Sequence, residues 1–142
     1  MTSRPPAHTH DLPPDLAAML SLVVPDGGGF GHREHVHLAF RTVREHGTSA
    51  AIAMISRWIR HIAAYQRVPQ KFNATVTTAW TQLVGHHVDA DPRVDDFGEF
   101  VDRHPALLDK RLLRHHYSSS LLASAAARRE CVPPDLAPFP WS

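Results

Sequence analysis

The chain has 142 residues, of which 43% are hydrophobic and 20% charged, and its formal net charge is +1 with histidine neutral. This composition is typical of one globular domain, and the balanced charge argues against a general attraction to nucleic acid or to a membrane surface. The sequence lacks a secretion signal and a run of roughly 20 apolar residues, so we expect a cytoplasmic protein. Cys131 is the single cysteine, so we expect no internal disulfide.

Two long helices are predicted in the first half of the chain. Residues 1–13, rich in proline and histidine, are expected to form a flexible segment ahead of a short helix over 16–23. A glycine-rich loop leads into the first long helix, over 32–46, which ends at Gly47 because glycine readily adopts the left-handed conformation. The second long helix begins with an N-cap at residue 48 or 49 and runs to about residue 66.

A third long helix is predicted over residues 71–85, with an apolar face formed by Phe72, Val76, Ala79, Trp80 and Leu83. Shorter helices are expected over 94–103, 106–115 and 119–129, followed by an extended, proline-rich tail over 132–142. No segment alternates apolar and polar residues as a half-buried strand does. We therefore predict an all-α fold, in which residues 14–131 form one compact bundle of three long helices plus shorter helices.

Three histidines cluster at the start of the first long helix, in the run Phe30-Gly31-His32-Arg33-Glu34-His35-Val36-His37. On a helical projection His32 lies within the apolar stripe and His35 at its edge, whereas His37 points to solvent with the neighbouring arginines. Histidine titrates near neutral pH and is the commonest metal ligand. The cluster therefore indicates a polar pocket inside a helical protein.

Three interpretations of this cluster stay open. His32 and His35 could be catalytic, with His32 exchanging a proton with a substrate and His35 orienting it or acting as the complementary acid. Alternatively, they could bind a divalent transition metal ion, which needs at least a third ligand such as His86 or His87. They could also be structural histidines in a binding or interaction protein without catalysis.

A second group of candidate residues lies on one flank of the third long helix. Asn73, Thr77 and Trp80 share this flank and could orient a small polar ligand by hydrogen bonds in a mostly apolar pocket. The structural alternative is that the threonine hydroxyls bond to the preceding helical turn.

The chain resembles an uncharacterised family of small all-helical bacterial proteins over about residues 28–138. That family carries His-x-x-His near one helix start and a Tyr-His-Glu-Thr-x-Thr-like stretch at another. The resemblance rests on Phe30-x-His32-x-x-His35 before Ala39, on Phe72-Asn73-Ala74-Thr75-Val76-Thr77 before Trp80, and on Tyr117-Ser118, Leu122-x-Ser124, Ala127-Arg128 and Pro134-Asp135-Leu136. It implies a fold and the location of a site, but no reaction.

One departure from the family pattern bears on metal binding. Where the pattern has His-Glu, this chain has Asn73-Ala74. If that pair completes a metal site in the family, two of four ligands are missing here, since asparagine is a poor zinc ligand and alanine is none. The substitution favours a metal-free pocket over one in which His86 and His87 replace the lost ligands.

We therefore predict an enzyme that acts on a small organic molecule by histidine acid–base chemistry, without an organic cofactor. Cyclisation, isomerisation, dehydration and addition all fit this prediction. The many arginines are interpreted as solvated helix faces, because acidic residues balance them and no recognition helix stands out. The expected partner is a small-molecule substrate, with no nucleic acid and no membrane.

Overall fold

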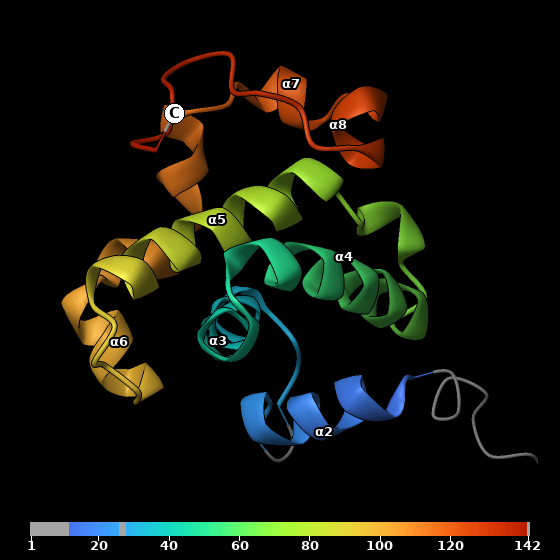
Figure 1. Cartoon of the computed structure of the whole chain (residues 1–142). Helices are drawn as coiled ribbons and strands as arrows, with labels where there is room; N and C mark the ends of the chain where they lie inside the picture. The colour runs from blue at the N-terminus through green and yellow to red at the C-terminus, as the bar shows by residue number, and fades with distance from the viewer. Residues whose placement is uncertain (1–11, 26–27, 142) are drawn as a thin grey trace, which may run out of the picture.

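The computed structural model describes residues 12–25 and 28–141, and within them it confirms the predicted all-α fold, with helices and no strand. Three long helices form its centre: α3 (His32–His46), α4 (Thr48–Tyr65) and α5 (Ala74–Ala90). Each of the three packs against the other two. Figure 1 shows α5 crossing α3 and α4, with the short helix α2 (Pro14–Val23) below them and the C-terminal segments above.

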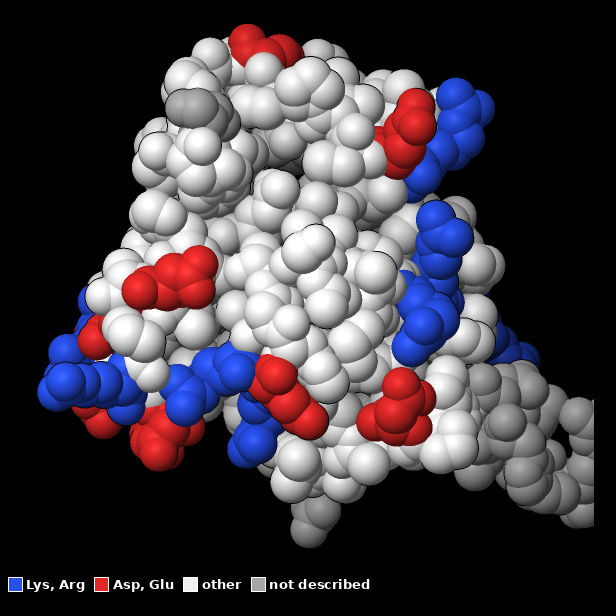
Figure 2. All heavy atoms as spheres, in the orientation of Figure 1, with Lys and Arg blue, Asp and Glu red and all other residues white. Residues whose placement is uncertain are grey.

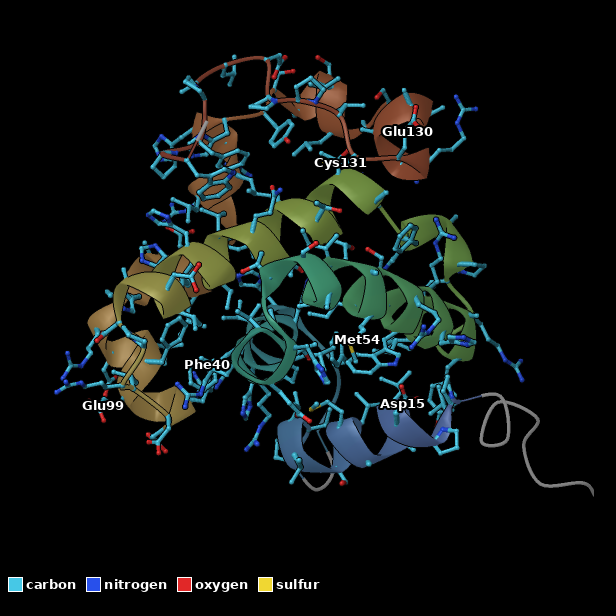
Figure 3. All side chains as sticks on the ribbon, viewed as in Figure 1. Asp15, Phe40, Met54, Glu99, Glu130 and Cys131 are labelled. Atoms are coloured by element: carbon cyan, nitrogen blue, oxygen red, sulfur yellow. The ribbon has the colours of Figure 1, made fainter. Side chains whose placement is uncertain are left out.

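Burial of apolar side chains between these helices holds the bundle together. The predicted apolar stripe of the second long helix is buried at Ile55, Trp58 and Ile62. From α3, Phe40 points toward α6 (Phe97–Arg103), as Figure 3 shows, and its ring centroid lies 4.5 Å from that of Phe100. The core therefore extends from the three long helices into the following short one.

The third long helix is displaced from its predicted position of 71–85. The Asn73 side chain accepts a hydrogen bond from the Val76 backbone N–H at 3.0 Å, which makes Asn73 the N-cap and starts α5 at Ala74. The predicted end at Gly85 is wrong. Gly85 lies inside α5, where a Cβ atom would collide with the Thr48 side chain, so its small size lets the start of α4 approach closely.

The shorter helices also differ from the prediction, and polar caps explain the new boundaries. Residues 105–115 form two 3₁₀ helices, η2 (Pro105–Leu108) and η3 (Lys110–His115), because Asp109 caps the second one. Ser124 accepts a hydrogen bond from the Ala127 N–H, which divides the predicted helix over 119–129 into α7 (Ser119–Leu122) and α8 (Ala125–Arg129). A further 3₁₀ turn, η1 (Pro69–Lys71), precedes α5, and α6 starts three residues later than predicted, capped by Asp96.

Hydrogen bonds attach the C-terminal segment to the bundle. The Tyr117 hydroxyl donates to the Val132 carbonyl at 2.8 Å. The Thr75 hydroxyl of α5 donates to the Ala127 carbonyl at 2.8 Å and accepts from the Val132 N–H at 3.1 Å. Phe139 is buried and belongs to the core. Residues 132–141, expected as part of an extended tail, therefore lie against the helical domain.

The charged surface is mixed in sign. Figure 2 shows Lys and Arg interspersed with Asp and Glu around α6, whereas the face over α4 and α5 in this view carries few of these residues. Within residues 12–25 and 28–141, no helix has the length and apolar character needed to cross a membrane.

Candidate functional site

The start of α3 directs neighbouring side chains to two different hollows. The Gly31 N–H donates to the Glu34 carboxylate at 2.7 Å, and the His35 N–H makes the first helical bond to the Gly31 carbonyl. This cap fixes the helix start at His32. Because successive helical residues are rotated by about 100°, His32 and His35 line one hollow, while Arg33, Glu34 and His37 line the other.

We call the first hollow the histidine pocket. It has a volume of about 580 Å³, which lies within the range of small-molecule sites. Five parts of the chain form it: the start of α3, α4 through Ile59, the first half of α5, η3, and the segment over residues 117–123. Its apolar lining includes Phe30, Ile59, Val76, Trp80, Leu113 and Leu122.

His32 is held in this pocket by a bond to the main chain. Its Nε2 lies 2.8 Å from the Leu107 carbonyl oxygen. Because a carbonyl only accepts, Nε2 carries the hydrogen, and Nδ1 is left with the free lone pair. The imidazole meets the Trp80 ring edge to face, with centroids 4.3 Å apart. Nδ1 itself makes no hydrogen bond with the part of the chain that the structure describes.

The surroundings of His32 favour its neutral form. Burial lowers its pKa below 6.5, and the charge of Lys110 acts in the same direction. The Leu107 bond and the carboxylates of Asp109 and Glu34 oppose this shift but do not reverse it. At neutral pH His32 is therefore mainly an uncharged base.

The pKa of His35 is also lowered, and His35 is therefore neutral at neutral pH. Burial, followed by the charge of His32, lowers its pKa to about 4. Its Nε2 atom is buried without a hydrogen-bond partner, a property shared among the described residues only by the indole nitrogen of Trp58, which does not line the pocket. Among the described residues, no hydrogen bond joins His35 to His32. The Leu107 carbonyl, and not His35, therefore orients the His32 imidazole.

Two of the three predicted substrate-binding residues lie outside the pocket lining. The Asn73 amide caps α5 and donates to the Leu122 carbonyl at 2.7 Å, so both ends of this side chain have structural partners. Thr77 is buried inside α5, where its carbonyl accepts from the Thr81 hydroxyl. Trp80 does line the pocket, beside His32.

The alternative metal ligands are not brought together. His86 lies near the other end of α5, with its ring centroid 5.4 Å from those of His87 and Trp141. Among the described residues, no group of three or more His, Cys, Asp or Glu side chains is placed to hold a metal ion. His32 and His35 thus lack the third ligand that a zinc site requires.

The second hollow, which we call the α3–α6 hollow, is larger, at about 750 Å³, and it is lined by charges of both signs. His37, predicted to point to solvent, is instead half-buried and stacks on Phe97 with ring centroids 4.1 Å apart. Arg41 donates to its Nε2 at 3.0 Å, and the Arg33 guanidinium lies over the Phe97 ring. Burial, with the charges of Arg41 and Arg33, lowers the pKa of His37 to about 4.

Lys110 and Arg114 in the pocket lining, and the Leu107 carbonyl that holds His32, are features of the site that the sequence did not indicate. All three belong to the 3₁₀ segments, and Leu107 lies 75 residues beyond His32 in the sequence. No local motif connects them to the histidines.

Comparisons with protein-family models, curated proteins and solved structures gave no match. The chemistry of the pocket itself therefore carries the functional argument.

Proposed function

We propose that this protein is an enzyme that acts on a small organic molecule in the histidine pocket, with His32 as the residue that exchanges a proton with the substrate. The observation that carries the proposal is the bond from His32 Nε2 to the Leu107 carbonyl. It orients the imidazole, selects the tautomer with a free Nδ1, and does so in a pocket with mostly apolar walls.

The chemistry follows from the protonation state of His32. In its neutral form, Nδ1 takes a proton from a C–H or O–H group of the substrate, and the imidazolium formed returns that proton to another position. Nε2 is a hydrogen-bond donor in both states, so the Leu107 carbonyl holds the ring throughout. Cyclisation, isomerisation, dehydration and addition each need such a removal and return.

The role proposed for His35 changes from that expected on sequence. With a pKa of about 4, His35 holds almost no proton at neutral pH and is a poor store of acid. We assign it instead a place in the pocket wall as a neutral side chain, because it lines the pocket while its Nε2 atom is buried without a hydrogen-bond partner.

A non-catalytic function is the second candidate, and one observation favours it. The same His32–Leu107 bond ties the start of α3 to η2, which is a structural role sufficient to explain the histidine. In that case the pocket would bind a ligand without transforming it.

The two candidates are separated by proton exchange on a neutral probe ketone. We would follow exchange of the α-hydrogens of 2-tetralone in deuterated buffer by ¹H NMR, with free imidazole at equal concentration as the reference. The wild-type protein is expected to exceed this reference by about 100-fold, and His32→Gln is expected to lose most of the excess. His61→Gln, on α4 and outside the pocket lining, is the matched control and should retain it.

The pH dependence gives a second criterion. The rate of α-hydrogen exchange of 2-tetralone should fall as pH drops through the lowered pKa of His32, because protonation of His32 removes the base. A wild-type rate equal to that of imidazole, or a His32→Gln rate equal to wild type, would contradict the proposed catalysis and leave the binding function.

A further inference from the structure

The charged side chains that line the histidine pocket are all positive. Among the residues that the structure describes, Lys110 and Arg114, both on η3, are the only Lys, Arg, Asp or Glu side chains in its lining, so both formal charges are positive. Neither forms an ion pair with a carboxylate among the described residues. The nearest acid in sequence, Asp109, is bound to Arg111 by two hydrogen bonds of 3.0 and 3.2 Å. The two cations are therefore available to a ligand.

These cations lie next to the reactive part of the pocket. The charge of Lys110 is felt by the His32 imidazole, and Leu113 lies between Lys110 and Arg114 on η3 and contributes to the apolar lining. Most of the remaining lining, including Trp80 and Leu122, is apolar, and Tyr117 and Ser119 add hydroxyl groups. A ligand that matches this wall needs an apolar body and one negatively charged group.

We propose that the substrate is an apolar, ring-sized carboxylic acid, with its carboxylate bound by Lys110 and Arg114 and its body against Trp80, Leu113 and Leu122. This inference rests on the proposed function for the role of the site. Arginine pairs with carboxylates through two parallel hydrogen bonds, and lysine adds a second positive charge. The volume of about 580 Å³ accommodates a molecule of one to a few rings.

Binding of the carboxylate also has a consequence for His32. An anion beside the imidazole stabilises its protonated form and raises its pKa. It opposes the effect of Lys110, whose charge lowers that pKa. The substrate would therefore strengthen the base that acts on it.

The test compares two probes that differ only in charge, 2-naphthoate and 2-naphthamide. Their dissociation constants are measured by NMR titration of the ¹⁵N-labelled full-length protein, with the indole N–H of Trp80 as the reporter. Wild type is expected to bind the carboxylate about tenfold more tightly than the amide, which corresponds to about 1.4 kcal/mol. In Lys110→Gln/Arg114→Gln this ratio should fall to about one, with amide binding unchanged.

A matched double variant controls for net charge. Lys71→Gln/Arg129→Gln removes one lysine and one arginine that are exposed and lie outside the pocket lining, and it should keep the wild-type ratio. The inference is overturned if wild type fails to bind 2-naphthoate, binds both probes equally, or keeps its preference after loss of Lys110 and Arg114.

Failure of this inference is distinct from failure of the proposed function. The exchange test uses a neutral ketone and depends on His32, whereas the binding test depends on charge at η3. A carboxylate preference without ketone exchange would give a binding pocket for acids, and exchange without the preference would give a catalytic pocket for neutral substrates.

Discussion

The two hollows beside α3 arise from the same short run of sequence but use their polar groups differently. In the α3–α6 hollow, Arg41 is bonded to His37 and Arg44 donates to the carbonyls of Pro92 and Val94. In the histidine pocket, the Nε2 atom of His35 has no partner, and the cations of η3 face no carboxylate in the lining. The first set of charges holds the protein together, and the second is left for a ligand.

This difference shows why the larger hollow is the weaker candidate site. Its volume of about 750 Å³ exceeds that of the histidine pocket, yet its arginines already have protein partners. A polar group that already bonds to the protein must give up that bond to take a ligand, whereas a group without a protein partner does not. Unused bonding capacity is therefore a better guide to function here than size.

The largest effect is expected from Phe97→Ala, which removes the packing centre of the α3–α6 hollow. Phe97 is 8% exposed and contacts His37, Arg33 and Phe40. Its loss should lower the free energy of unfolding by about 3–5 kcal/mol, measured by urea denaturation. A loss below about 1 kcal/mol would contradict the view that this hollow is held by packing.

Acidification should destabilise the protein through both hollows. His35 and His37 each have a pKa of about 4 in the folded protein, against 6.5 in the unfolded chain. Below pH 6.5 the unfolded chain takes up protons that the folded protein does not, so stability falls as pH drops toward 4. For His35 the slope approaches about 1.4 kcal/mol per pH unit.

Salt should separate the two histidines in this acid range. The arginines contribute to the shift at His37, and their effect is screened at high ionic strength. Burial dominates at His35 and is insensitive to salt. We therefore expect high salt to raise the His37 pKa, measured by NMR titration, by more than that of His35. An equal change in both pKa values would contradict the view that the arginines contribute to the shift at His37 and that burial dominates at His35.

His35→Leu should stabilise the fold, in contrast to substitutions in the other hollow. It replaces a buried, unpartnered nitrogen with an apolar group of similar size, a change that relieves a desolvation cost of about 1–3 kcal/mol. Urea denaturation at pH 7 measures the gain. The control is His37→Leu, which should destabilise because it leaves Arg41 without its acceptor. Destabilisation by His35→Leu would show that its Nε2 is satisfied in solution.

The smallest effect is expected from Arg41→Gln. This change should raise the pKa of His37 above about 4, since it removes a neighbouring positive charge. Its effect on the free energy of unfolding should stay below about 1 kcal/mol, because Arg41 is a partly exposed surface cation. Binding of 2-naphthoate should be unchanged. Weaker binding would assign the anion to the α3–α6 hollow.

The long helices were predictable because their signals are local. The apolar period over residues 32–46 and the glycine that follows predicted both ends of α3. The prediction for α5 used the same period but placed the start too early, since the capping role of Asn73 was taken for ligand binding. Gly85 was taken as a helix end because its contact with Thr48 depends on tertiary packing.

The candidate site was predictable only on the α3 side. The positions of His32 and His35 on the helix follow from their spacing, and the structure has both of them line one pocket. The opposite wall comes from 3₁₀ segments distant in sequence, which carry no periodic pattern. The Leu107 carbonyl in particular is a backbone group, and the identity of the side chain at 107 says nothing of its hydrogen bond.

The parts of the chain that line the histidine pocket are synthesised at different times. The helices that carry His32 and Trp80 leave the ribosome before residues 117–123, which complete the pocket lining. This segment is attached to the bundle through the Tyr117–Val132 hydrogen bond. At about 5–20 residues per second, several seconds pass between the emergence of Trp80 and that of Val132. The residues that complete the pocket and hold its last segment in place are therefore the last of its parts to be synthesised.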